Sequence, residues 1–268
     1  MTTTKSQTLR IKYCKLGKIR FTSHRDTARM WERALRRAEL PVAYTQGYSP
    51  RPRISFGLAL PTCYESNAEY LDVTINNSTI DLTTLAATLS AALPVGIDVL
   101  NVNIIDPKEP SLQETITSCT WKIETSGTDA STLQAALNTA MEAESLLVSR
   151  THKGRDVQDD IRPGVISVEI ADTGTHTPEL PDSVTLVAQL ATKPRAIRPS
   201  DLLACLDTPV EAVCIRRLNQ WTATGTEPPV AHSGSTTALS DKHSKEASNG
   251  QDNSVERQLG PRSGPSLP

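Results

Sequence analysis

Arginine is the residue whose spacing in this sequence most clearly indicates a chemical role. On a helical wheel of about 100° per residue, five arginines between His24 and Glu39 share one face within about 120°. Guanidinium groups bind phosphate through paired hydrogen bonds and stack on flat rings. The face predicts an anionic partner such as RNA, and it consists of Arg25, Arg29, Arg33, Arg36 and Arg37.

A solvated helix face is the alternative interpretation. Solvated faces usually mix both signs of charge, because oppositely charged side chains at i and i+4 stabilise the helix. Here the acidic side chains are only Glu32 and Glu39, at the margin of the face. The opposite side of the wheel is apolar and is expected to pack inward; it holds Trp31, Ala34, Leu35 and Ala38.

The segment after this helix, YTQGYSPRPRISFG, combines aromatic, amide and guanidinium groups on a backbone shaped by Gly47, Pro50 and Pro52. Such a loop can stack bases and bind phosphates together. A rigid turn with a tyrosine packed into the core is the alternative. The candidate RNA-binding or anion-binding residues here are Gln46, Gly47, Tyr48, Arg51 and Arg53, with Tyr44 and Ser49 beside them.

His24 and Asp26 are the candidates for acid or base catalysis, at the first turn of the helix. The alternative is that His24 only begins the helix, because no second catalytic group is tied to it by spacing. We therefore expect a binding protein without catalytic activity of its own.

A second polar cluster follows in HKGRDVQDDIRPGV. It matches no metal-ligand spacing, so we expect ion pairs in a loop and no metal site. The later segment KPRAIRPSD is expected to add a small basic patch if folding brings it near the helix. The charged residues are His152, Lys153, Arg155, Asp156, Asp159, Asp160 and Arg162 in the first segment, and Lys193, Arg195 and Arg198 in the second.

The net charge of −2 hides a strong asymmetry along the chain. Residues 1–53 hold 13 basic and 3 acidic side chains, whereas residues 54–150 hold 3 basic and 12 acidic ones. The start of the chain has no apolar stretch of signal or membrane length, and the five cysteines are scattered. We expect a reduced, cytoplasmic protein that binds no membrane.

The first part of the chain predicts the order strand, helix, strand, strand, helix, strand. Ser23 is the expected N-cap of the first helix, with Asp26 three residues on, and Pro41 ends it. The expected strands are 8–13, 54–56, 69–75 and 97–105, and the expected helices are 23–39 and 81–93. The KIRF segment is expected to extend the first strand or to pair with it.

A similar order recurs after the linker PKEPS, with one extra strand. We therefore predict an α+β fold of two tandem ferredoxin-like, split β-α-β units with antiparallel sheets. The units span residues 1–107 and 108–222, and the polar residues 223–268 are predicted to form a disordered C-terminal tail.

The run FTSHRDTARMWERALRRAELPVAYTQGYSPRPRISFGLALP, followed by EYLDVTI, resembles the radical-SAM-linked bacterial protein family of unknown function. The resemblance covers residues 8–105, with later echoes in KGRDVQDDIRP and IRPSDLL. It implies service to a radical SAM partner enzyme and supplies no catalytic residues. The chain lacks the C-x-x-x-C-x-x-C spacing of a radical SAM cluster, so we expect no cofactor in this chain itself.

Three hypotheses follow for the function. The first is a binding module that presents RNA or another phosphate-bearing substrate to a radical SAM enzyme. The second is a metal-independent RNA-processing enzyme that uses His24. The third is a protein-interaction subunit whose arginines meet an acidic partner.

Overall fold

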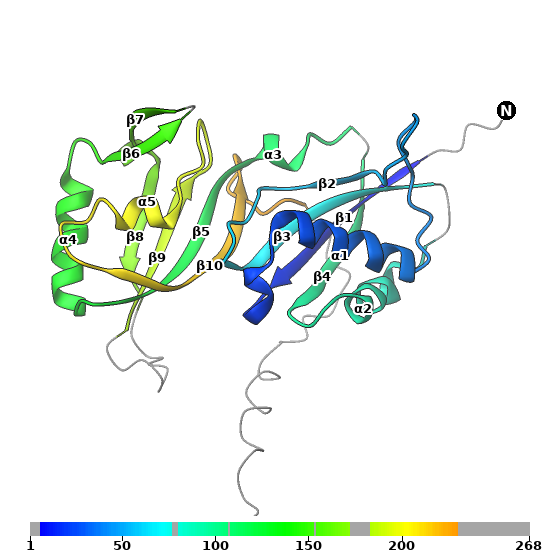
Figure 1. Cartoon of the computed structure of the whole chain (residues 1–268), viewed down its shortest axis with the longest axis horizontal. Helices are drawn as coiled ribbons and strands as arrows, with labels where there is room; N and C mark the ends of the chain where they lie inside the picture. Colours follow the sequence, from blue (N-terminus) through cyan, green and yellow to red (C-terminus); the bar gives the residue numbers. More distant parts are fainter. Residues whose placement is uncertain (1–5, 77–79, 107, 153, 172–182, 230–268) are drawn as a thin grey trace, which may run out of the picture. The chain divides into compact units, whose positions relative to one another are not determined.

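The computed structural model describes residues 6–76, 80–106, 108–152, 154–171 and 183–229. The fold is α+β, with one large, mostly antiparallel sheet and few helices (Figure 1). The sheet has the strand order β4-β1-β3-β10-β5-β9-β8, and β2 pairs with β3 beside this path. None of the helices in the described part of the chain is long and apolar enough to cross a membrane.

The first half contains β1 (Gln7–Lys15), a 3-10 helix η1 (Gly17–Phe21), α1 (His24–Arg37), β2 (Ile54–Phe56), β3 (Glu65–Ile75), α2 (Leu82–Ala92) and β4 (Ile97–Ile105). The second half contains α3 (Leu112–Thr115), β5 (Ile116–Ser126), α4 (Ala130–Glu142), β6 (Leu147–His152), β7 (Arg155–Asp160), η2 (Arg162–Gly164), β8 (Val165–Ile170), β9 (Val184–Ala191), α5 (Pro199–Leu203) and β10 (Glu211–Thr222).

The predicted cap of α1 is confirmed. The Ser23 hydroxyl accepts a hydrogen bond from the Asp26 backbone N–H at 3.1 Å and donates one to the Asp26 carboxylate at 2.7 Å. The cap satisfies one of the N–H groups that have no partner within the helix. The helix ends at Arg37, and Glu39 then takes a positive φ of 54°, two residues before Pro41.

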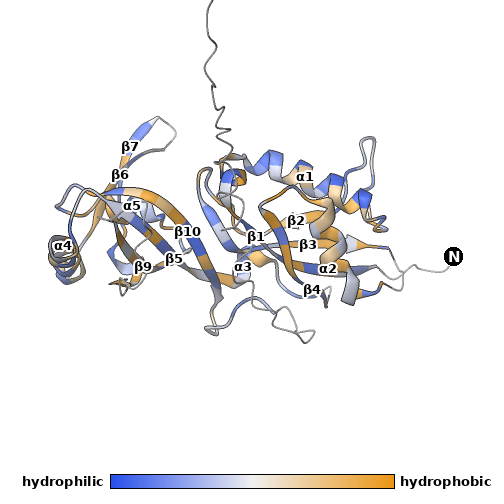
Figure 2. Cartoon of the chain, turned by 90° about the horizontal axis from the view of Figure 1, so that it is seen from below, coloured by the Kyte–Doolittle hydropathy of each residue, from blue (hydrophilic) through white to orange (hydrophobic). Residues whose placement is uncertain are grey.

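The apolar face of α1 packs where the wheel places it. Trp31, Ala34 and Leu35 are buried, in a core cluster that also includes Leu71 of β3 and Leu89 of α2. Figure 2 shows both hydrophilic and hydrophobic residues along α1, as expected for a helix with one side on a core.

The tandem arrangement of two ferredoxin-like units with separate sheets is not confirmed. Strands of both predicted units lie in one sheet, because β10 pairs in parallel with β3, with Arg216 opposite Glu65 and Arg217 opposite Ser66. This pairing carries the sheet across the predicted boundary at the PKEPS linker.

Two local predictions are wrong. The KIRF segment forms the 3-10 helix η1 instead of a strand. The RDVQDD segment, which was expected to be a loop, is strand β7 and pairs with β6 in a sheet of two strands. This hairpin accounts for the extra strand of the second half, and the largely polar residues of β7 show no alternating apolar pattern.

The predicted tail lies mostly outside the described residues. Its first part, residues 223–229, is described and meets the sheet. There the Glu227 carboxylate accepts hydrogen bonds from Lys12 at 2.7 Å and from Asn219 at 2.9 Å.

Candidate anion-binding face

The arginine face of α1 is solvent-exposed. Arg29 lies 3.5 Å from the Asp26 carboxylate, and Arg37 donates to the Ala92 carbonyl at 3.3 Å. The other three form no ion pair with any described residue; they are Arg25, Arg33 and Arg36. The structure therefore places five guanidinium groups on one face, and within the described residues only Arg29 among them has an ion-pair partner.

The inner side of the helix fixes this face in place. Trp31 is fully buried and meets the Tyr13 ring edge-on, with 4.9 Å between the ring centroids. An edge-to-face aromatic pair adds to the stability that buried apolar area gives. Rotation of α1 about its axis would expose Trp31, so the arginines stay directed toward solvent.

The loop after α1 is a narrow two-armed turn. Thr45 and Arg51 bridge its arms, because the Thr45 N–H donates to the Arg51 carbonyl at 2.9 Å and the Arg51 N–H donates to the Thr45 hydroxyl at 3.0 Å. Gly47 at the tip has a φ of 133°, which residues with a side chain rarely adopt. The candidate residues Gln46, Gly47, Tyr48, Arg51 and Arg53 are all exposed.

The two tyrosines of the loop face solvent. Tyr48 is fully exposed, and Tyr44 is 51% exposed. The alternative that this loop buries a tyrosine in the core is therefore wrong. Both rings are available to a partner.

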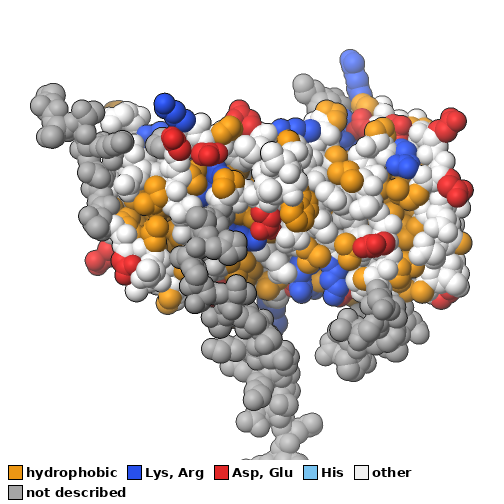
Figure 3. All heavy atoms as spheres, turned by 180° about the vertical axis from the view of Figure 1, so that it is seen from behind, with side chains coloured by type: hydrophobic (Ala, Val, Ile, Leu, Met, Phe, Trp, Pro, Cys, Tyr) orange, Lys and Arg blue, Asp and Glu red, His pale blue; other side chains and the backbone are white. Residues whose placement is uncertain are grey.

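The loop and the helix meet at a hollow of about 160 Å³. Glu32 and Arg36 line it from α1, and Tyr44 and Pro52 line it from the loop. Glu39 also lines the hollow, which places Arg36 of the helix near Tyr44 of the loop. We call the exposed arginines of α1 together with the loop at 44–53 the arginine face. On the opposite side of the molecule, acidic and basic side chains are interspersed (Figure 3).

Several basic residues near the N-terminus do not belong to this face. Arg10 is buried and binds Asp72 with two hydrogen bonds of 2.9 and 3.0 Å. Lys15 is buried and donates to the Thr22 carbonyl at 2.9 Å. Arg10 and Lys15 thus serve the fold, which composition alone does not reveal because Asp72, the partner of Arg10, lies 62 residues further along the chain.

His24 and Asp26 have structural contacts. The His24 ring meets the Phe56 ring edge-on at 5.1 Å between centroids. Asp26 takes part in the cap with Ser23 and in the contact with Arg29. The contacts of His24 and those of Asp26 are thus with different residues.

Asp159 of the second polar cluster forms ion pairs beside the β6–β7 hairpin. Arg150 binds Asp159, and Arg195 contacts both Asp159 and Asp201 at 3.1 Å. Within the described residues, no three His, Cys, Asp or Glu side chains gather as metal ligands would. The Lys153 position and the His152 side chain lie outside the described part.

The basic segment KPRAIRPSD does not join the arginine face. Arg195 and Arg198 instead line a larger cavity together with the segment from Leu58 to Pro61. No local pattern indicates this cavity, since Leu58 and Arg198 in its walls are more than a hundred residues apart.

The family model of an uncharacterized protein conserved in bacteria (DUF2344) matches residues 8–199. The chain belongs to this family. The DUF2344 match covers α1, the loop and most of the second half, and its description names neither RNA nor a radical SAM enzyme. No curated protein matches the chain.

Among solved structures, the chain is similar to an unknown protein from Galdieria sulphuraria, at 11% identity. The match covers 78% of this chain and 99% of the other, with a TM-score of 0.25.

Proposed function

We propose that this DUF2344 protein is a binding module that holds RNA, or another phosphate-bearing substrate, on its arginine face. The observation that carries the proposal is the exposure of Arg25, Arg33 and Arg36 with no ion-pair partner among the described residues. Like charges on one helix face repel each other, and phosphate groups remove that repulsion.

The loop supports RNA over a simple inorganic anion. A fully exposed Tyr48 at the tip of a turn offers its ring to a base, and Arg51 and Arg53 beside it offer charge to the backbone. Proteins that bind single-stranded RNA combine stacking rings with a basic track in this way.

We infer that the substrate is presented to a radical SAM partner enzyme. This part rests on the resemblance of the residues that build the arginine face, from His24 to Arg53. Among the described residues, no group of His, Cys, Asp or Glu side chains beside this face is arranged to hold a metal. A binding role for the chain suits a reaction carried out by a second protein.

We also infer that the fold derives from two split β-α-β units. The strand orders support this, since β4-β1-β3-β2 in the first half and β10-β5-β9-β8 in the second follow the same pattern with antiparallel neighbours. The β6–β7 hairpin is then an insertion in the second unit.

The test is retention of a single-stranded RNA oligonucleotide by the full chain at low salt. The double variant Arg29→Glu with Arg33→Glu should abolish retention. A matched control, Lys108→Glu with Arg155→Glu, makes the same change of charge at exposed sites away from α1 and should retain RNA. Absence of retention by the unmodified protein at low salt would refute the proposal.

A further inference from the structure

A cavity of about 680 Å³ lies between the segment from Leu58 to Pro61 and the segment from Arg195 to Asp201. Trp121 of β5 and Arg217 of β10 also line it. Its volume falls within the range of about 300–1,000 Å³ that is typical of small-molecule sites. No residue of α1 or of the loop at 44–53 lines it, so it is separate from the arginine face.

The lining of this cavity is apolar with a few charged groups. Leu60 and Trp121 are buried, in a core cluster separate from the one that α1 covers, and present apolar surface. Four arginines and one aspartate supply the charge, namely Arg150, Arg195, Arg198, Arg217 and Asp201. Apolar walls with a small number of placed polar groups are the usual composition of a ligand site.

The charges around the cavity leave one guanidinium unpaired. Arg150 and Arg195 share Asp159, and Arg195 also contacts Asp201. Arg217 pairs with Glu69 at 2.8 Å. Arg198 is exposed and forms no ion pair within the described residues, so the four arginines exceed the three carboxylates by one.

Three of the lining residues also carry buried N–H donors without a partner, which are Trp121 Nε1, Arg195 Nη2 and Arg217 Nε. A buried donor without an acceptor destabilises the fold, and an acceptor brought by a ligand removes this cost. Neighbouring atoms cover these donors, so a ligand reaches them only if the side chains around them move. Arg198, which is already exposed, meets the ligand first.

The cavity is equipped for binding and not for covalent chemistry at its cysteine. Burial raises the pKa of the Cys119 thiol to about 11, so this lining group stays neutral near pH 7. The Arg217 guanidinium lies over the Trp121 ring, 4.8 Å from its centroid. This stack forms a rigid flat surface in the cavity wall.

We propose that this cavity binds a small organic acid with a flat apolar body and a single negative charge, and that Arg198 contacts that charge. One negative charge balances the single surplus guanidinium, and a flat body fits walls formed by Trp121, Leu58 and Leu60. This site goes beyond the RNA-binding role and does not depend on it.

The probe is 8-anilinonaphthalene-1-sulfonate, which joins flat aromatic rings to one sulfonate. Its fluorescence should show saturable binding to one site on the full chain. Arg198→Glu should weaken binding by about tenfold or more, as expected for loss of a charge-assisted contact. The control Arg155→Glu, at an exposed position outside the cavity, should leave binding unchanged.

Two further arms test the shape and the charge of the ligand. Ala196→Trp, at an exposed lining residue, should block the probe by filling the cavity. N-phenyl-1-naphthylamine, which has the same rings without the sulfonate, should bind more weakly than the sulfonate. Equal binding of the two probes would overturn the requirement for a negative charge.

Displacement of the bound probe by competitors shows whether the site prefers a carboxylate or a phosphate as the ligand's charged group. Indole-3-acetate, with one carboxylate, should displace the probe better than adenosine monophosphate, whose phosphate carries nearly two charges. Displacement by neither, or probe binding that survives both cavity variants, would overturn the proposal. Because Arg29→Glu with Arg33→Glu should leave probe binding intact, failure here is distinguishable from failure of RNA binding.

Discussion

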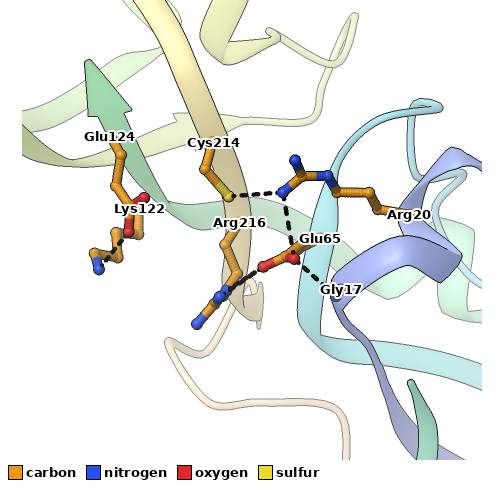
Figure 4. A network of polar contacts seen from close by, with 7 residues as sticks. All are labelled: Gly17, Arg20, Glu65, Lys122, Glu124, Cys214 and Arg216. Carbon is orange, nitrogen blue, oxygen red and sulfur yellow. Dashed lines mark hydrogen bonds and ion pairs between the residues drawn. The ribbon is translucent and has the colours of Figure 1, made fainter. Parts of the chain in front are cut away.

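Glu65 at the start of β3 accepts two hydrogen bonds from Arg216 of β10, at 2.9 and 2.6 Å (Figure 4). The same carboxylate accepts from the Gly17 N–H at 2.8 Å and lies 3.5 Å from Arg20. These contacts sit beside the parallel pairing of β3 with β10. The Glu65 carboxylate therefore holds together strands from the two halves of the chain.

Substitution of Glu65 by Gln should destabilise the fold by about 2–3 kcal/mol, because charge-assisted hydrogen bonds are lost at a buried site. Urea denaturation measures the change. The control is Glu124→Gln, which removes the carboxylate of a partly exposed pair with Lys122 and should cost less than about 1 kcal/mol. Equal losses in the two variants would contradict the role of Glu65.

The stability that Glu65 contributes should depend on pH. Burial raises the pKa of this carboxyl, but the hydrogen bonds from Arg216 and Gly17, together with the charges of Arg216 and Arg20, hold the pKa below its ordinary value. Since the folded-state pKa is depressed, the contribution is present above the unfolded value of about 4.3 and is lost as pH falls through the folded value. The difference in unfolding free energy between the unmodified protein and Glu65→Gln should therefore shrink as the pH falls from about 5 to about 3.

Removing one partner of the buried ion pair between Arg217 and Glu69 should destabilise the fold more than removing both. Arg217→Met leaves the Glu69 charge without its guanidinium and should destabilise the fold by about 3–5 kcal/mol. The double variant with Glu69→Leu should be more stable than Arg217→Met alone, because no buried charge remains. Thermal unfolding of both variants checks this, and a double variant less stable than Arg217→Met would contradict it.

Tyr48→Ala should weaken RNA binding without a change in stability. The ring is fully exposed and buries no area in the fold, whereas a stacked base is worth about 1–3 kcal/mol. Filter binding and urea denaturation of the same preparation measure the two effects. Val95→Ala, at another exposed apolar side chain, is the control and should bind RNA normally.

The elements of the first half could be predicted from sequence because their signals are local. Ser23 and Asp26 mark the start of α1, and the spacing of Trp31 and Leu35 shows which side packs inward. The strand β4 was predicted with its observed bounds, Ile97–Ile105, since it is a short run rich in β-branched apolar residues.

Long-range contacts could not be predicted in this way. The ion pair of Arg10 depends on Asp72, which lies on the neighbouring strand and 62 residues away in the sequence, so no local pattern indicates it. The cavity brings Leu58 next to Arg198, and no periodicity links those positions. Such contacts depend on strand order, which one sequence does not specify.

The salt dependence of RNA binding tests the central claim most directly. For a single strand, the slope of the logarithm of affinity against the logarithm of salt concentration is about −0.7 per phosphate contact. If Arg29 and Arg33 each contact a phosphate, replacing both by Gln should make the slope shallower by about 1.4, whereas Lys108→Gln with Arg155→Gln should leave it unchanged. Equal slopes for the unmodified protein and the Arg29 and Arg33 variant would show that the arginine face does not hold the RNA.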